Sequence, residues 1–328
     1  MRSTLPDLFV EPRETLLDRR AHVEDDLALE PPVVPPLGDL LPDLRPRLVE
    51  IGGLRLFCEE QGDGMPLVLL HGGPGHSHHG FHPAFSRLDD GVRAIYYDQR
   101  GCWRSDYYPG EGYSVAQSVA DLEALRRALG IDRWAVLGHS YGGFLAQCYA
   151  ARHPAFVAGL VLVGSAIPSR EMFRLDPSPF PDFLSPEEQA AQEAIFANPA
   201  LTPAQLMYNL LLNGRWRRNH YYRPTRETLA RIARYEWTHD DGYYDAVVGD
   251  MLHWDLTGAF DAGAIPTLIV EGRWDLTWNT DKPDKLHRLH PHARLELFPR
   301  SGHLPFNDEP DHFFGLLEEF LAGLPIDN

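Results

Sequence analysis

Residues 134–153 read Trp-Ala-Val-Leu-Gly-His-Ser-Tyr-Gly-Gly-Phe-Leu-Ala-Gln-Cys-Tyr-Ala-Ala-Arg-His, and this stretch decides the fold class. Its first four residues form a short apolar run typical of a strand, and residues 141–153 can form a helix that stops before Pro154. A G-x-S-x-G pattern at 138–142 joins the two. A tight strand-to-helix turn holds a serine hydroxyl exposed, so the pattern indicates a nucleophile at Ser140.

The same alternation of strand and helix extends in both directions from this turn. Strands are expected at 48–51, 54–60, 67–70, 92–97, 159–163, 267–270 and 294–298, and helices at 115–129, 284–290 and 310–321. Short apolar strands alternating with helices predict a mainly parallel sheet covered on both faces, which is an α/β fold.

Two parts of the chain depart from the alternation. Residues 1–46 are rich in proline and charge and are expected to form an extended arm. Residues 166–260 are helical in character and dense in aromatic side chains, which favours an inserted helical lid. The core domain is then assigned to residues 47–165 and 261–328.

Composition excludes several classes of function. The 328 residues carry 30 Lys and Arg against 47 Asp and Glu, a net charge of −17, so a nucleic-acid partner is not expected. No stretch approaches the roughly 20 apolar residues of a membrane helix, and the amino terminus lacks the apolar region of a signal peptide. We therefore expect a cytoplasmic protein with no membrane partner. Its three widely spaced cysteines suggest neither disulfides nor a structural zinc site.

A nucleophilic serine needs a base and an acid, which follow it in the chain order Ser, acid, His. Asp275 and His303 each lie in the loop after a predicted strand, where such partners are required. His303 would take the serine proton, and Asp275 would orient the imidazole. Glu271 and Asp255 are rival acids, but Glu271 lies at the strand end itself and Asp255 in or beside the lid.

Glycines follow another predicted strand at residues 71–75, His-Gly-Gly-Pro-Gly. Acyl transfer places negative charge on the carbonyl oxygen, and two backbone amides aimed at that oxygen stabilise it. The expected donors are the amides of Gly73 and Tyr141, with Gly72 in the same turn against the substrate. His71 is expected to anchor this loop.

Several histidines follow at residues 76–82, His-Ser-His-His-Gly-Phe-His. No neighbouring carboxylate in the sequence completes a recognisable ligand pattern, so no metal site is expected there.

Together these motifs resemble the proline iminopeptidases of the α/β-hydrolase superfamily, over nearly all of residues 48–321. The resemblance rests on residues 71–75, on Asp-Gln-Arg-Gly-Cys-Trp-Arg-Ser at 98–105, on 138–143, on Gly-Arg-Trp-Asp at 272–275 and on Ser-Gly-His at 301–303. It implies an α/β-hydrolase fold with a lid, and a serine hydrolase that releases an N-terminal proline or other small residue through an acyl-enzyme. No metal or organic cofactor is implied, and the substrate would be a small molecule or short peptide.

Family members bind the free α-amino group with acidic lid side chains, and here the match departs from the family. The lid motifs Trp-Glu-Gly and Glu-Asn-His-Tyr-Phe are absent. The nearest candidates are Glu236, with Asp240 and Asp241 behind it, and these can equally be solvated charges. An esterase or amidase acting on small apolar acyl groups, and a non-catalytic ligand-binding protein of the same fold, stay open as alternatives. The oligomeric state is not determined by the sequence.

Overall fold

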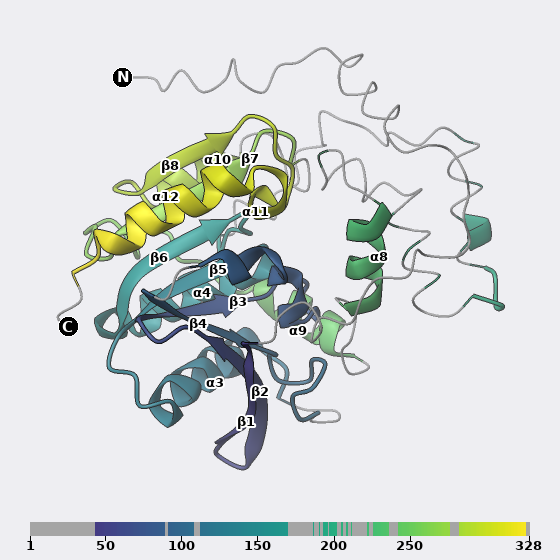
Figure 1. Ribbon diagram of the computed structural model, residues 1–328, viewed down its shortest axis with the longest axis horizontal. Helices are drawn as coiled ribbons and strands as arrows, with labels where there is room; N and C mark the ends of the chain where they lie inside the picture. The colour runs from purple at the N-terminus through teal and green to yellow at the C-terminus, as the bar shows by residue number, and fades with distance from the viewer. Residues whose placement is uncertain are drawn as a thin grey trace.

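The computed structural model of this chain describes residues 43–88, 91–107, 112–169, 222, 226–235, 242–275 and 282–325. Between residues 186 and 211 it also describes 186, 190, 193–195, 197–201, 205, 208 and 211. These parts of the chain form one eight-stranded sheet with helices on both faces (Figure 1). The predicted fold class is therefore confirmed.

Six neighbouring strands of the sheet are parallel and two form an antiparallel edge. The strands are β1 (Arg45–Ile51), β2 (Leu54–Gln61), β3 (Met65–Leu70), β4 (Val92–Tyr97), β5 (Trp134–His139), β6 (Val157–Val163), β7 (Thr267–Gly272) and β8 (Arg294–Phe298). In space they run β1-β2-β4-β3-β5-β6-β7-β8. Strand β2 pairs antiparallel with both β1 and β4, whereas the pairs from β4 to β8 are parallel. The carboxyl ends of the parallel strands thus meet at one edge, where ligand sites of such sheets lie.

Helices cover the two faces of this sheet. The described α-helices are α3 (Val115–Ala128), α4 (Tyr141–Arg152), α8 (Arg226–Tyr235), α9 (Tyr243–Met251), α10 (Lys282–Leu289), α11 (Pro305–Asp308) and α12 (Pro310–Ala322). Short 3-10 helices occur at η3 (His78–Phe81), η4 (Ala84–Arg87) and η5 (Pro154–Phe156). The sequence did not predict α11 or the three 3-10 helices, which are too short to show a periodic apolar pattern.

Strand β3 explains why the core has two layers. Its alternate residues Leu67 and Leu69 lie in a buried cluster with Phe residues of α12, whereas Val68 and Leu70 lie in a second cluster with residues of α3 and α4. Successive side chains of a strand point to opposite faces, so a strand buried on both faces is apolar throughout. This is why its sequence is a continuous apolar run.

Helix α3 begins and ends where its sequence predicts. The Ser114 side chain accepts a hydrogen bond from the Gln117 amide at 3.1 Å, and Gly130 with φ of 66° follows the last turn. The Val115 amide also donates to Asp250 Oδ2 of α9 at 2.8 Å. A residue of the predicted lid block therefore caps a helix of the core.

The block predicted as a lid is described only in part. Helix α9 packs on the core, where Tyr243 is buried and its ring lies 5.0 Å from that of Tyr113. Helix α8 contacts η3. The boundaries of arm, core and lid stay predictions, and residues 1–42 of the arm lie outside the described residues.

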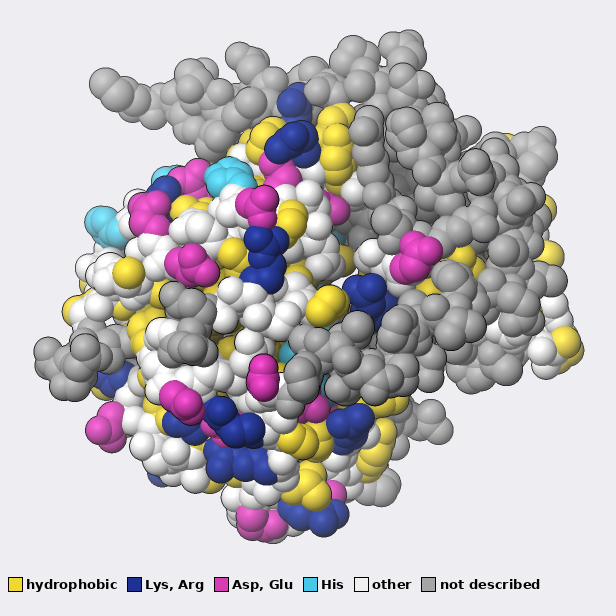
Figure 2. All heavy atoms as spheres, in the orientation of Figure 1, with side chains coloured by type: hydrophobic (Ala, Val, Ile, Leu, Met, Phe, Trp, Pro, Cys, Tyr) yellow, Lys and Arg dark blue, Asp and Glu magenta, His cyan; other side chains and the backbone are white. Residues whose placement is uncertain are grey.

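Charge is mixed over the visible surface, where Figure 2 shows acidic and basic side chains interspersed. Within the described residues, no helix combines the length and the apolar character that crossing a membrane requires.

Candidate active site

Ser140 lies in the turn between β5 and α4, in a strained backbone conformation. Its φ of 57° and ψ of −120° are unusual for a residue with a side chain. Neighbouring strand β6 holds this turn, because the Ser140 amide donates to the Val163 carbonyl at 3.0 Å and the Ala166 amide donates to the Ser140 carbonyl at 3.1 Å. Such a turn at the end of a central parallel strand presents the serine at the carboxyl edge of the sheet.

Glycines are required around this turn because other backbone passes too close for a side chain. A Cβ at Gly142 would lie 2.0 Å from the Leu70 carbonyl oxygen, and one at Gly138 would lie 2.2 Å from the Gly142 oxygen. Both distances are shorter than any real contact. The glycines of the pattern thus permit β3, β5 and α4 to converge at Ser140.

Asp275 and His303 come together from the loops after β7 and β8. His303 Nδ1 donates a hydrogen bond to Asp275 Oδ2 at 2.7 Å, and both residues are 6% exposed. Gly164, after β6, leaves room for the imidazole, because a Cβ there would lie 3.0 Å from His303 Nδ1. The bond fixes the ring orientation and leaves Nε2 as the proton-accepting nitrogen.

His139, the residue before Ser140, ties the serine turn to the histidine loop. Its Nε2 donates to the His303 carbonyl at 2.9 Å, and the two rings lie 4.6 Å apart. Burial lowers the pKa of His139 well below its usual value, so the ring is neutral and keeps one N–H for this bond. Sequence reasoning missed this residue, although it occupies the variable position of the G-x-S-x-G pattern.

A buried lysine lies behind Asp275, and sequence reasoning missed it as well. Lys282 Nζ donates to Asp275 Oδ2 at 2.9 Å and lies 2.5 Å from Glu271 Oε2. Burial opposes the lysine charge, but Asp275 and Glu271 together raise the pKa of Lys282. Burial and the Asp275 charge raise the pKa of Glu271, although Lys282 lowers it. Lysine occurs only at positions 282 and 285, and that rarity was the available signal.

The structure also distinguishes among the three carboxylates considered as partners of His303. Strand β7 extends to Gly272, two residues beyond its predicted end, so Glu271 is a strand residue. Its Oε1 accepts from the Ser165 amide at 3.2 Å, and Oε2 faces Lys282. Asp255 instead accepts from Thr257 in an exposed turn. Of the three acids, Asp275 is the one hydrogen-bonded to His303.

The glycine turn after β3 passes against Ser140. A Cβ at Gly72 would lie 3.1 Å from Ser140 Cβ, and Gly73 has a φ of 114°, which only glycine adopts readily. Tyr141 is the first residue of α4, so its amide has no partner within the helix. Two backbone segments able to supply amides thus flank the serine, and the positive end of the helix dipole adds to them.

His71 holds this turn in place through hydrogen bonds. Its Nε2 accepts a hydrogen bond from the Gln99 amide at 3.1 Å, and its Nδ1 donates to the Gly72 carbonyl at 3.0 Å. Burial lowers the pKa of His71 to about 4, so the ring is neutral as this pattern requires. Gln99 Nε2 also donates to the His71 carbonyl at 3.0 Å. The Asp-Gln-Arg-Gly segment therefore positions the turn.

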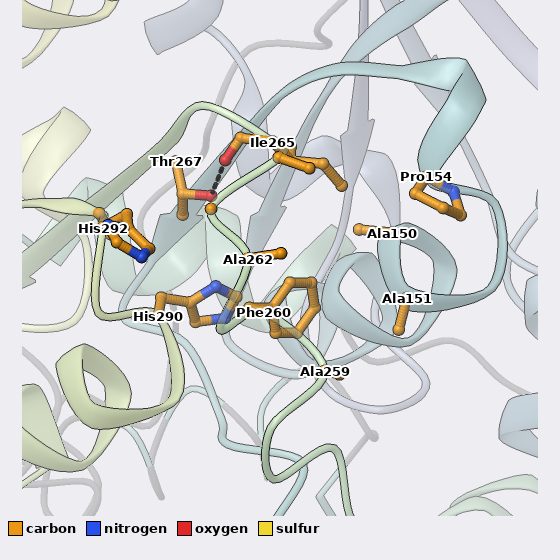
Figure 3. Close-up of a pocket in the computed structure, with 13 residues that line it drawn as sticks. Ala150, Ala151, Pro154, Ala259, Phe260, Ala262, Ile265, Thr267, His290 and His292 are labelled. Carbon is orange, nitrogen blue, oxygen red and sulfur yellow. Dashed lines mark hydrogen bonds between the residues drawn. The ribbon is translucent and has the colours of Figure 1, made fainter.

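The predicted lid contacts Glu236, Asp240 and Asp241 lie outside the described residues. A pocket drawn in Figure 3 lies elsewhere, beside Phe260 and His290, with alanines forming much of its wall. Its lining includes none of the residues gathered around Ser140.

Known proteins are similar to this chain over most of its length. Residues 65–310 match the family described as alpha/beta hydrolase fold. A proline iminopeptidase of Saccharolobus solfataricus is 30% identical over 80% of this chain and 86% of its own length. One from Levilactobacillus brevis is 32% identical over 78% of this chain and 88% of its own.

A solved structure supports the fold. An esterase from Exiguobacterium antarcticum superposes with a TM-score of 0.67 at 23% identity, over 85% of this chain and 100% of the esterase. The chain belongs to the α/β-hydrolase fold family, and within it to the proline iminopeptidase family.

Proposed function

We propose that this protein is a serine hydrolase that removes an N-terminal proline, or another small residue, from short peptides. The observation that carries the proposal is the 2.7 Å hydrogen bond from His303 to Asp275, in loops held next to the strained Ser140 turn. The relatives named proline iminopeptidase support the choice of substrate.

In the first half of the reaction, Ser140 Oγ attacks the carbonyl carbon of the scissile amide and His303 Nε2 accepts the serine proton. Asp275 stabilises the imidazolium that forms. The amides of Gly73 and Tyr141 donate to the oxyanion, and removing one such donor typically costs about 2.7–4 kcal/mol of transition-state stabilisation. His303 then protonates the departing amine, which leaves a prolyl ester on Ser140.

Water completes the cycle. His303 takes a proton from the water as it attacks the ester, a second tetrahedral intermediate forms, and the proton returns to Ser140 as free proline leaves. No cofactor enters either half. Recognition of the free amino group by Glu236, Asp240 or Asp241, and a cytoplasmic location, stay predictions.

The experiment compares proline p-nitroanilide with its N-acetylated analogue and with p-nitrophenyl acetate. We expect turnover of the free amine, at least tenfold slower turnover of the acetylated analogue, and loss of both in Ser140→Ala. Ser86→Ala is the matched control, because the Ser86 hydroxyl donates to the Pro83 carbonyl in η4 and takes no part in the site.

Three outcomes overturn the proposal in different ways. Equal rates for free and acetylated proline substrates exclude recognition of an ammonium group. Ester turnover without amide turnover makes the protein an esterase. Saturable ligand binding without any turnover, and without fluorophosphonate labelling of Ser140, makes it a binding protein of the same fold.

A further inference from the structure

Glu59, His78 and His82 converge in the interior of the protein, and the proposed hydrolysis uses none of them. Glu59 belongs to β2, His78 begins η3, and His82 follows it. Each residue offers a ligand atom, and these atoms all lie within 4.8 Å of one another. The carboxylate that the sequence lacks near the histidine-rich loop is thus supplied by a strand 19 residues away.

The two distances from Glu59 to the histidines are those expected between ligands around one ion, and the third separation is at most 4.8 Å. Glu59 Oε2 lies 3.2 Å from His78 Nε2 and 3.4 Å from His82 Nε2. In a tetrahedral zinc site with bonds of about 2.0–2.2 Å, neighbouring ligand atoms lie about 3.3–3.6 Å apart. The two separations from Glu59 match that range to within about 0.1 Å.

A second carboxylate fixes the orientation of His78. Asp98 Oδ1 accepts from His78 Nδ1 at 2.7 Å, and both side chains are fully buried. A metal-bound histidine commonly donates its other N–H to a carboxylate in this way, which directs the free electron pair of Nε2 toward the ion. Asp98 also accepts from the His78 amide at 3.0 Å.

His82 is the least satisfied member of the group. It is 4% exposed, and its Nδ1 has no hydrogen-bond partner among the described residues. Its Nε2 faces Glu59 at 3.4 Å without the geometry of a hydrogen bond. Its ring packs at 4.4 Å from that of Tyr96, which holds it in this direction. Buried polar atoms normally have a bonding partner, so a partner for this imidazole is expected on the side of Glu59, toward which its Nε2 points.

We propose that Glu59, His78 and His82 bind a divalent transition-metal ion, with Zn²⁺ the best match, and that water takes the fourth position. Two imidazoles and one carboxylate form a donor set that zinc accepts readily. The other oxygen of Glu59 pairs with the half-exposed Arg104 at 3.5 Å, which marks the side nearest to solvent. The ion would tie β2 to η3 and has no step in the hydrolysis.

The metal-free alternative is a charged His78 hydrogen-bonded between Glu59 and Asp98. That arrangement explains His78 but leaves His82 with only the long 3.4 Å contact to Glu59. The two possibilities differ in a measurable way, because only the metal site requires His82.

The test uses the full chain, stripped with a strong chelator and titrated with Zn²⁺ by calorimetry, with elemental analysis after dialysis. We expect one zinc per chain and a thermal midpoint raised by several degrees at saturating zinc. His82→Phe should abolish both effects while keeping a ring beside Tyr96. The matched control His76→Ala removes a histidine of the same loop outside the group and should retain both effects.

Two further variants and a second metal sharpen the result. Glu59→Gln should lower zinc affinity strongly, and Asp98→Asn by about 10–100-fold. Co²⁺ in place of zinc should give the intense visible absorption of a tetrahedral ion. Absence of stoichiometric zinc overturns the proposal. Equal zinc binding by the wild type and His82→Phe also overturns the proposal. An equal loss of zinc binding in His76→Ala and His82→Phe overturns it as well, because it would indicate adventitious binding by the loop. If His82→Phe does not fold, Glu59→Gln decides, and unchanged affinity there is equally contrary.

Discussion

Replacing Lys282 by methionine should destabilise the protein in a strongly pH-dependent way. Lys282 is 3% exposed, and its ammonium is shared by two carboxylates, Asp275 at 2.9 Å and Glu271 at 2.5 Å. Methionine keeps the apolar stem and removes the charge. The change leaves two negative groups buried side by side, which is the costly way to break a buried ion pair.

The magnitude follows from the burial of all three partners. Removing one member of a buried pair typically costs about 3–5 kcal/mol, and we expect this loss at pH 9, above the pKa of about 7 that Glu271 has beside Lys282. Without the ammonium, the raised pKa of Glu271 rises further above its unfolded value of 4.5. When a carboxyl group has a higher pKa in the folded state than in the unfolded state, the protein loses stability as the pH rises from the unfolded-state value to the folded-state value. The loss should therefore be smaller at pH 5, where Glu271 is protonated with or without Lys282, and grow toward pH 9.

A double variant supplies the control. In Lys282→Met with Glu271→Gln, the buried cation and one anion are removed together, so most of the lost stability should return at pH 9. The free energy of unfolding is measured by urea denaturation of each variant at pH 5, 7 and 9. An equal loss at pH 5 and pH 9, or a double variant less stable than the single one, would refute the reasoning.

Catalysis offers an independent readout of the same lysine. Because 2.9 Å and 2.7 Å separate the three atoms in turn, the ammonium lies no more than about 5.6 Å from His303 Nδ1. At that distance, the Coulomb energy between the ammonium and a unit charge on His303 is about 3 kcal/mol at an effective dielectric constant of about 20. Removing this charge should move the acid limb of kcat/KM to higher pH by roughly one to two units. An unchanged limb would mean that Lys282 acts on stability alone.

Three further changes test the site and its scaffold. Asp275→Asn should lower kcat by about 10³–10⁴-fold at pH 8 with the fold retained, and a loss below tenfold in a steady-state assay would contradict its proposed role. Gly142→Ala should prevent accumulation of folded protein, because its Cβ would lie 2.0 Å from the Leu70 oxygen. The alanine of Gly130→Ala meets open space, and this variant should cost only about 1 kcal/mol of backbone strain at φ of 66°. The yield of soluble protein and circular dichroism melts decide, and a folded Gly142→Ala with a midpoint similar to that of Gly130→Ala would contradict the packing argument. Arg100→Lys should lose about 1–3 kcal/mol in urea unfolding, because a paired fork of two 2.7 Å bonds to a carboxylate of α3 becomes a single contact.

The sequence located all eight strands of the sheet, because each has apolar residues that pack in the core. Strands β4 and β8 have the predicted bounds, and the hairpin of β1 and β2 forms around its Gly-Gly turn. Strand β7 is longer than predicted because its last two residues, Glu271 and Gly272, are not apolar. A buried charged residue in a strand is invisible to a hydrophobic pattern when its partner lies elsewhere in the chain.

Residues that act through distant partners were missed for the same reason. The ion pair of Lys282 with Glu271 spans a loop, and Glu59 meets His78 only after β2 has taken its place in the sheet. His139 contacts the loop of His303, which lies 164 residues later. Nothing local in the chain marks these contacts, because each side chain is ordinary until the sheet brings its partner near.

What the sequence determined by itself is the local chemistry of its turns. The role of the glycines around Ser140 and after β3 can be predicted from the sequence, because a close backbone approach excludes every other residue. The strand periodicity then places these turns at one edge of the sheet. The tertiary structure decided which groups meet there. It bonded His303 to Asp275 and turned Glu271 toward Lys282, because hydrogen bonds require contact within about 3 Å and side-chain direction is set by strand register and loop path.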